Sequence, residues 1–173
     1  MDYFDSNDPY FKGSWTLHTL RWMMGEEKFW NAVRRLIYDT PDPWSLSYPI
    51  TPTQRSSEDF ITIASDEYGE DLRWFFDAYL FSKDIPTLKV DRSNNELRLS
   101  FRDLPSLILD IPVVLYEDSA LKGDKHNVSR STTLSIRSDG SSHAVPSSAR
   151  IQIDPEVKIF REFSTAQRCQ ISQ

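Results

Sequence analysis

Residues 10–21 read Tyr10-Phe11-Lys12-Gly13-Ser14-Trp15-Thr16-Leu17-His18-Thr19-Leu20-Arg21, and they predict an unusual helix start. Pro9 suits the first turn of a helix, where its missing N–H costs nothing. Tyr10 stands at the mouth of this helix, from which a hydroxyl can point into a cleft and donate to an oxyanion. A helix that is apolar on two sides is expected to be buried. Two such faces follow the tyrosine, one with Leu17, Leu20 and Met24 and the other with Phe11, Trp15, His18 and Trp22.

Three more helices are predicted before residue 84. Gly25 ends the first helix, and the acidic pair Glu26-Glu27 favours the start of a second. Ser56-Ser57-Glu58-Asp59 is a capping sequence that opens a third, which Gly69 closes. Glu70-Asp71 then opens a fourth. The inward residues expected of these helices are Phe29, Trp30, Val33 and Ile37 in the second, Phe60, Ile61, Ala64 and Tyr68 in the third, and Leu72, Phe75, Phe76, Tyr79 and Leu80 in the fourth.

From Thr87 the apolar residues recur at every second position, which indicates strands. Ser93-Asn94-Asn95 is read as a turn, Asp139-Gly140 as a hairpin turn and Asp154-Pro155 as a further turn. Pro112 lies within an alternating run and suggests a sheet edge or a bulge. About seven short strands are expected, at Leu88–Val90, Leu97–Phe101, Leu107–Leu115, Val128–Arg137, Val145, Ile151–Ile153 and Val157–Phe163.

The order of these elements predicts an α+β chain, with a four-helix segment followed by an antiparallel β-sandwich. All five tryptophans lie at or before Trp74, which indicates two cores of different character. We place the boundary near Lys83-Asp84-Ile85-Pro86. The expected organisation is a helical subdomain over residues 1–84, a sandwich over 85–164 and a polar tail over 165–173.

Composition excludes several classes of function. The net charge of −6 leaves no basic stripe to neutralise phosphates, so we expect no nucleic-acid partner. No apolar run approaches the length of a membrane span, so no membrane association is expected. A single cysteine, Cys169, excludes an internal disulfide and a cysteine-based zinc site.

Few residues could carry chemistry. His18, His126 and His143 are far apart and form no zinc-binding pattern, so we expect no metal and no cofactor in this chain. We interpret His18 as a hydrogen-bonded core residue. The acidic residues Asp66, Glu67, Glu70 and Asp71 are interpreted as capping and solvated groups. Tyr10 remains, either as a half-buried tyrosine at a helix start or as a catalytic donor.

Several motifs resemble the gluzincin aminopeptidases, the family of membrane alanyl aminopeptidase and leukotriene hydrolase (peptidase family M-one). They cover most of the chain, with specific motifs in the first half and generic ones in the second. They are Tyr10-x-Lys12-Gly13, Leu17-His18-x-Leu20-Arg21, Gly25-Glu26-x-x-Phe29-Trp30, Ser57-Glu58-Asp59-Phe60, Gly69-x-Asp71-Leu72-x-Trp74-Phe75-Phe76, Ile85-Pro86 and Asp154-Pro155.

The resemblance implies that Tyr10 is catalytic, with its hydroxyl stabilising the oxyanion of a tetrahedral intermediate opposite a zinc-bound water. It also implies a helical part of a catalytic domain followed by a β-sandwich. The family's H-E-x-x-H zinc motif, its downstream glutamate and its G-x-M-E-N motif are absent from this sequence. The chain therefore looks like the C-terminal piece of a metallopeptidase, and by itself we expect no zinc binding and no hydrolysis.

Three functions compete on this sequence. The first is a fragment or subunit of a zinc aminopeptidase, which meets a peptide substrate only when a zinc-bearing segment completes it. The second is a non-catalytic interaction module derived from the same family. A carbohydrate-binding sandwich is the third, although the strand half has no tryptophan and few tyrosines to offer a sugar. Because three short helices cannot cover both apolar faces of the first helix, we expect self-association or a partner chain there.

Overall fold

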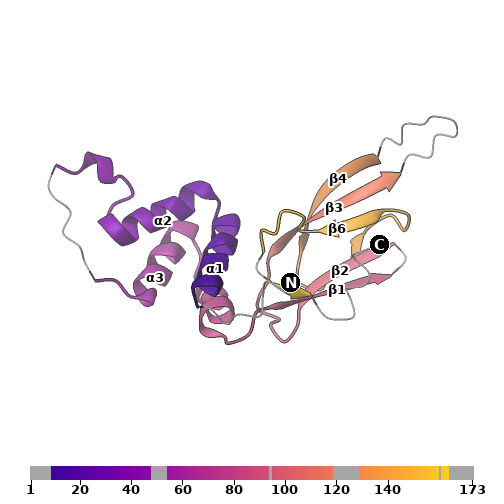
Figure 1. Ribbon diagram of the computed structural model, residues 1–173, viewed down its shortest axis with the longest axis horizontal. Coiled ribbons are helices and arrows are strands. Elements are labelled where there is room, and N and C mark those ends of the chain that lie inside the picture. The colour runs from indigo at the N-terminus through magenta and orange to yellow at the C-terminus, as the bar shows by residue number, and fades with distance from the viewer. Residues whose placement is uncertain (1–8, 48–53, 94, 119–128, 160, 164–173) are drawn as a thin grey trace. The chain divides into compact units, whose positions relative to one another are not determined.

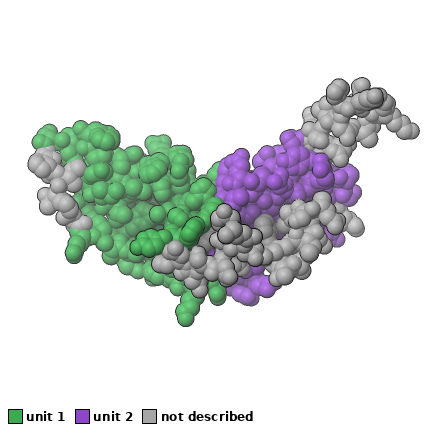
Figure 2. All heavy atoms as spheres, viewed as in Figure 1, with its two compact units in different colours: residues 1–84 green, residues 85–173 purple. Residues whose placement is uncertain are grey.

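A computed structural model describes residues 9–47, 54–93, 95–118, 129–159 and 161–163 (Figure 1). The chain divides into two compact units, Met1–Asp84 and Ile85–Gln173, which Figure 2 shows in different colours. The first is helical and the second is built from strands, so the predicted α+β fold class is confirmed. The expected polar tail, residues 165–173, lies outside the described residues.

The first two helices are α1 (Pro9–Met24) and α2 (Glu26–Tyr38). Gly25 separates them at a φ of 82°, in the region that glycine adopts without a steric penalty. The inward stripe predicted for α2 is partly wrong. Phe29 and Ala32 are buried, whereas Trp30 and Ile37 are exposed. The indole N–H of Trp30 donates to Glu26 Oε2 at 3.0 Å, which satisfies its polar atom at the surface.

The proline-rich connection contains a short 3-10 turn, η1 (Pro43–Ser45). After it come α3 (Ser57–Tyr68) and α4 (Arg73–Phe76), and the chain continues directly from α4 into a π-helix, η2 (Asp77–Phe81). The predicted fourth helix is thus an α-turn followed by a wider π-turn. Five residues of this segment were predicted to face inward. Four of them are buried, namely Leu72, Phe75, Phe76 and Tyr79, whereas Leu80 is partly exposed.

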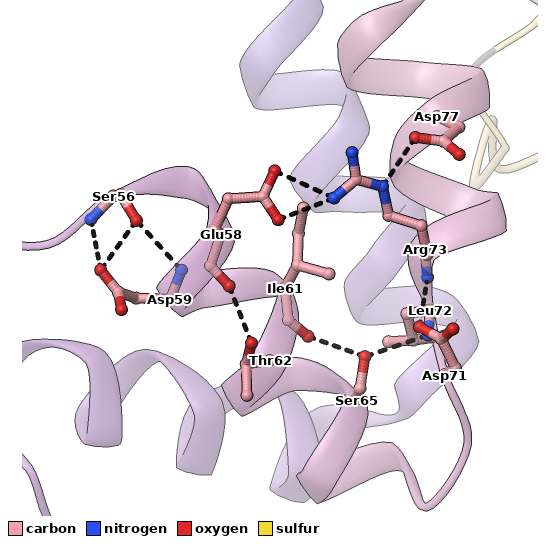
Figure 3. A network of polar contacts seen from close by, with 10 residues as sticks. All are labelled: Ser56, Glu58, Asp59, Ile61, Thr62, Ser65, Asp71, Leu72, Arg73 and Asp77. Atoms are coloured by element: carbon pink, nitrogen blue, oxygen red, sulfur yellow. Dashed lines mark hydrogen bonds and ion pairs between the residues drawn. The ribbon is translucent and has the colours of Figure 1, made fainter.

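Polar contacts join α3 to the start of α4 (Figure 3). The Ser65 hydroxyl donates to the Ile61 carbonyl at 2.7 Å and accepts the N–H of Leu72 at 3.0 Å. Arg73 contacts both carboxylate oxygens of Glu58, at 2.9 and 2.7 Å, and Asp77 Oδ1 at 2.9 Å. These bonds join α3 to the start of α4 through both backbone and side-chain atoms, so they fix the position of α4 against α3.

The second unit contains two small sheets. One has the order β5-β2-β1-β7 and the other the order β4-β3-β6. All pairs are antiparallel except β1 and β7, which run parallel with Thr87 opposite Glu162, so the purely antiparallel expectation is wrong at this edge. The strands are β1 (Thr87–Ser93), β2 (Glu96–Phe101), β3 (Asp110–Asp118), β4 (Ser129–Arg137), β5 (His143–Ala144), β6 (Arg150–Ile153) and β7 (Glu162–Phe163).

Pro112 lies in β3, the central strand of its sheet, and not in an edge strand as the sequence suggested. Its carbonyl accepts the N–H of Asp154 at 2.6 Å. In an antiparallel ladder the N–H and C=O of one residue point to the same neighbour, so the donor that proline lacks would have faced Asp154. Strand β6 ends at Ile153, and the chain turns away at Asp154 with a φ of 46°. Pro112 therefore lies just past the end of the β3–β6 pairing, where its missing N–H removes no bond of that ladder.

Two other expectations for the strands need correction. Asp139-Gly140 does not close a hairpin, because it carries the chain from β4 in one sheet to β5 in the other. In this connection between the two sheets, the Gly140 N–H donates to the Leu99 carbonyl of β2 at 2.9 Å. The last strand is limited to Glu162–Phe163, since Asp154 and Val157 take positive φ values that interrupt an extended chain before it.

The alternation of apolar residues is confirmed by burial. In β2 the buried side chains alternate with exposed or half-buried ones, and in β3 they alternate likewise. Each sheet thus buries one face. The buried side chains of this unit include Leu88, Leu97, Leu99, Phe101, Leu107, Leu109, Ile111, Val113, Ile136, Val145 and Ile159.

Candidate functional site

Tyr10, the predicted catalytic residue, is the second residue of α1 and lies at its start, as the sequence indicated. Its side chain is 85% exposed. The half-buried tyrosine considered as the alternative is therefore not what the fold presents. An exposed hydroxyl at a helix start can donate a hydrogen bond to a group that approaches from outside this unit.

Lys12 lies two residues after Tyr10 in the same turn and contacts a segment that is distant in the sequence. Its ammonium donates a hydrogen bond to the carbonyl of Ser82, directly after η2. Partial burial lowers the pKa of Lys12 from its usual range, and the negative charge of Asp84 opposes that shift. One of the three donors of this ammonium thus makes a structural contact within the helical unit.

The two apolar faces of α1 have different surroundings. Leu20 and Met24 are buried, and Thr16 and Thr19 are buried beside them. The Thr16 hydroxyl donates to the Lys12 carbonyl at 2.8 Å, which allows a polar residue to lie on the inner face. Leu17, which was expected inside with Leu20, is 41% exposed.

The other face of α1 is directed to the surface. Phe11 is 51% exposed, Trp22 is 40% exposed and Trp15 is half-buried between them. His18 is exposed and meets Trp15 edge to face, with ring centroids 5.4 Å apart, so the expectation of a core histidine is wrong. We call the side chains of Phe11, Trp15, His18 and Trp22 the α1 aromatic face.

The described residues do not provide a metal site. Within them, no group of three or more His, Cys, Asp or Glu side chains is arranged to hold an ion. Arg35 pairs with Glu67 at 2.7 Å and with Asp66 at 3.3 Å. Asp71 accepts the N–H of Arg73 at 2.9 Å. Asp71 thus acts at a helix start, as the sequence suggested, whereas Asp66 and Glu67 form ion pairs that were not predicted.

The remaining histidines and the cysteine lie away from α1 in the sequence. His143, in β5, has its Nε2 atom 3.1 Å from the hydroxyl of Ser141. His126 and Cys169 lie outside the described residues. Where the structure describes the chain, no helix has the length and apolar character needed to cross a membrane.

Sequence reasoning identified Tyr10 but missed the contact between Lys12 and Ser82. The two residues are 70 positions apart, and nothing local marks Ser82 as the acceptor. The burial of Thr16 and Thr19 was also missed. Their spacing from Leu20, at i−4 and i−1, was the available signal, but hydroxyl side chains on a helix usually suggest its outer face.

No protein-family model matches this chain, and no curated protein matches it significantly. Among solved structures, its fold is similar to that of aminopeptidase A from Legionella pneumophila, determined in complex with aspartic acid, with a TM-score of 0.59 and 17% sequence identity. The match covers 89% of this chain and 17% of the aminopeptidase chain. At this identity the likeness concerns the fold alone. The chain thus has the fold of a segment that, in the similar structure, makes up a small part of a much longer peptidase.

Proposed function

We propose that this chain is the C-terminal part of a zinc aminopeptidase of the gluzincin type and contributes the Tyr10 hydroxyl to its active site. The observation that carries the proposal is the position of Tyr10, exposed at the start of α1 in a Tyr-x-Lys-Gly step. The fold similarity to an aminopeptidase supports it. The reaction is hydrolysis of the N-terminal peptide bond of a peptide substrate.

In this proposal Tyr10 acts by donating one hydrogen bond. When the carbonyl carbon of a peptide bond becomes tetrahedral, negative charge develops on its oxygen. A donor that is already aimed at that oxygen stabilises the transition state more than the ground state. Removing one such donor in other enzymes lowers kcat by roughly 10²–10³-fold.

The zinc of such an enzyme does not fit the residues described here. They lack a cluster of three or more ligating side chains, so the metal ligands would have to come from another segment. Every step that involves the metal belongs to that segment. This chain supplies the tyrosine and a surface on which the segment can dock.

The α1 aromatic face is the proposed docking surface. It carries no charged residue among Phe11, Trp15, His18 and Trp22, and it begins beside Tyr10. The nearby Arg21 is engaged by Glu26 at 2.6 Å. An apolar face next to the exposed hydroxyl is expected where a second part of a catalytic domain packs.

The test is to co-express this chain with a candidate zinc-bearing segment, one that contains an H-E-x-x-H motif, and to assay an aminoacyl anilide. We expect the completed assembly to hydrolyse it, and Tyr10→Phe to lower kcat about 10²–10³-fold with little change in KM. Tyr38→Phe, a tyrosine at the far end of α2, is the matched control. Unchanged turnover by Tyr10→Phe would refute the catalytic role.

An interaction module that kept the fold without chemistry is the second candidate, and the exposed α1 aromatic face favours it. The same co-expression separates the two. If a zinc-bearing segment binds this chain without producing hydrolysis, the interaction module is the better description.

A further inference from the structure

The described side chains at the start of α1 bury little surface. Tyr10 and Phe11 are exposed, and Thr16 is the first fully buried residue after them. Gly13 has one of the lowest helix propensities, which costs about 1 kcal/mol relative to alanine. The first turn also contains no acidic residue to complement the helix dipole. A contact from elsewhere in the unit would therefore anchor this turn more firmly.

The end of η2 provides such an anchor. In this π-helix the N–H of Ser82 bonds the carbonyl of Asp77 at 3.1 Å, five residues back. π-turns are rare and occur mostly where they serve a function. The Ser82 carbonyl lies beyond the last turn, at a helix end where backbone carbonyls lack partners and cations are favoured. Lys12 places its ammonium on that carbonyl, and Asp84 adds a negative charge.

We propose that Lys12 is a positioning residue for Tyr10, because its bond to the Ser82 carbonyl fixes the first turn of α1 against the end of η2. Tyr10 belongs to that turn, and a side chain that is 85% exposed cannot be located by burial. The place that its hydroxyl can reach therefore depends on where the backbone of this turn lies. The consequence for catalysis rests on the proposed function, since a displacement of about 1 Å can cost a factor of about 10² in rate.

The contact is tested on the chain itself with Lys12→Met and Lys12→Arg. Methionine keeps a long apolar stem without a donor, whereas arginine keeps both the cation and the donor. The chain also offers a matched control, because Lys28 makes the same kind of bond, from its ammonium to the Tyr68 carbonyl at 2.9 Å. Lys28→Met removes an equivalent bond elsewhere in the same unit.

Two measurements report on the first turn. The first is amide hydrogen exchange at residues 13–16, whose N–H groups bond back to the carbonyls of that turn. The second is the 19F spectrum of the chain labelled with 3-fluorotyrosine, in which Tyr10→Phe identifies the Tyr10 signal. We expect Lys12→Met to accelerate exchange at these amides about tenfold, the size of a lost charge-assisted hydrogen bond, and to shift the Tyr10 signal.

Lys12→Arg should restore both readouts, and Lys28→Met should leave both unchanged. The proposal is overturned if Lys12→Met leaves exchange in the first turn as it was, if arginine fails to restore it, or if exchange rises equally throughout the helical unit. Neither measurement depends on hydrolysis. The positioning role can thus fail while Tyr10 proves catalytic, and it can hold while Tyr10 proves inactive.

Discussion

Asp154 shows how much one buried side chain can organise. It is fully buried, and its carboxylate accepts the N–H groups of Lys158 at 2.7 Å and Ile159 at 2.9 Å. The same carboxylate pairs with Arg161, which also donates to the Ile159 carbonyl at 2.8 Å. The backbone N–H groups of Lys158 and Ile159, which follow β6, therefore depend on the charge of this carboxylate.

Asp154→Asn should destabilise the strand unit by about 3 kcal/mol, because it removes the buried carboxylate charge that pairs with the buried Arg161. Asparagine tolerates the positive φ of 46° at this position, so the backbone is not the cause. Urea-dependent amide exchange over residues 150–159 measures the loss. Glu156→Gln, which breaks the exposed pair with Lys158, is the control and should cost less than about 0.5 kcal/mol. A loss below 1 kcal/mol in Asp154→Asn, roughly that of a surface pair, would contradict this account.

At the scale of elements, α3 is the helix whose start is most completely specified by its own sequence. The Ser56 hydroxyl accepts the N–H of Asp59 at 3.2 Å, and the Asp59 carboxylate accepts the N–H of Ser56 at 2.7 Å. This reciprocal capping box satisfies two donors that a helix start leaves unpaired. At the other end Gly69 takes a φ of 96° and closes the helix.

Ser56→Ala should lower the free energy of unfolding of the helical unit by about 1 kcal/mol, the usual cost of losing a cap. Ser57→Ala is the matched control, since Ser57 is the first helical residue and alanine suits a helix. Because all five tryptophans precede residue 75, tryptophan fluorescence during urea unfolding follows this unit alone. Equal effects of the two substitutions would argue against the cap.

The same box predicts a dependence on pH. The bonds that Asp59 accepts from the Ser56 backbone and hydroxyl lower its pKa below the ordinary 3.8. A carboxyl whose pKa is lower in the folded state stabilises that state above its unfolded pKa. This contribution is lost as the pH falls through the folded value, so the start of α3 should fray below about pH 4. An NMR titration of the Asp59 carboxyl checks this, with Asp59→Asn as the variant that should lack the transition. A midpoint at or above the ordinary value would refute it.

At the scale of the whole molecule, the two units differ in what they leave exposed. In the strand unit, one sheet ends in the short strands β5 and β7, and the other ends in the short strand β6 and the nine-residue strand β4. The helical unit instead exposes the α1 aromatic face together with Leu17. Exposed aromatic side chains of this kind are expected at a place of association, and we propose that the zinc-bearing segment or another copy of the chain binds there.

The isolated chain should therefore self-associate through α1. Light scattering should show a mass that rises with concentration, and the double substitution Phe11→Ser, Trp22→Ser should return the chain to a monomer. Trp44→Ser is the control, because Trp44 is 90% exposed but lies in η1, outside α1. A wild-type chain that stays monomeric at high concentration, with Trp22 emitting as a buried residue, would show that the helices cover this face themselves.

Local features of the sequence determined the elements of this protein. The switch of apolar period from 3.6 to 2 after residue 84, the glycines at 25 and 69, and the capping residues Ser56 and Asp59 act within a few positions of where they stand. The place of Tyr10 at a helix start also followed from its local setting. Its exposure was not predicted, and its catalytic role stays a prediction.

Tertiary structure decided which residues meet. Both faces of α1 are apolar enough to be buried, and only packing against α2 and η2 selected the face of Leu20 and Met24. Three further features depend on segments that are far apart in the chain. They are the bond from Lys12 to Ser82, the parallel pairing of β1 with β7, and the position of Pro112 in a central strand. Such contacts depend on where whole elements come to rest, and periodicity and capping act over too few residues to specify that.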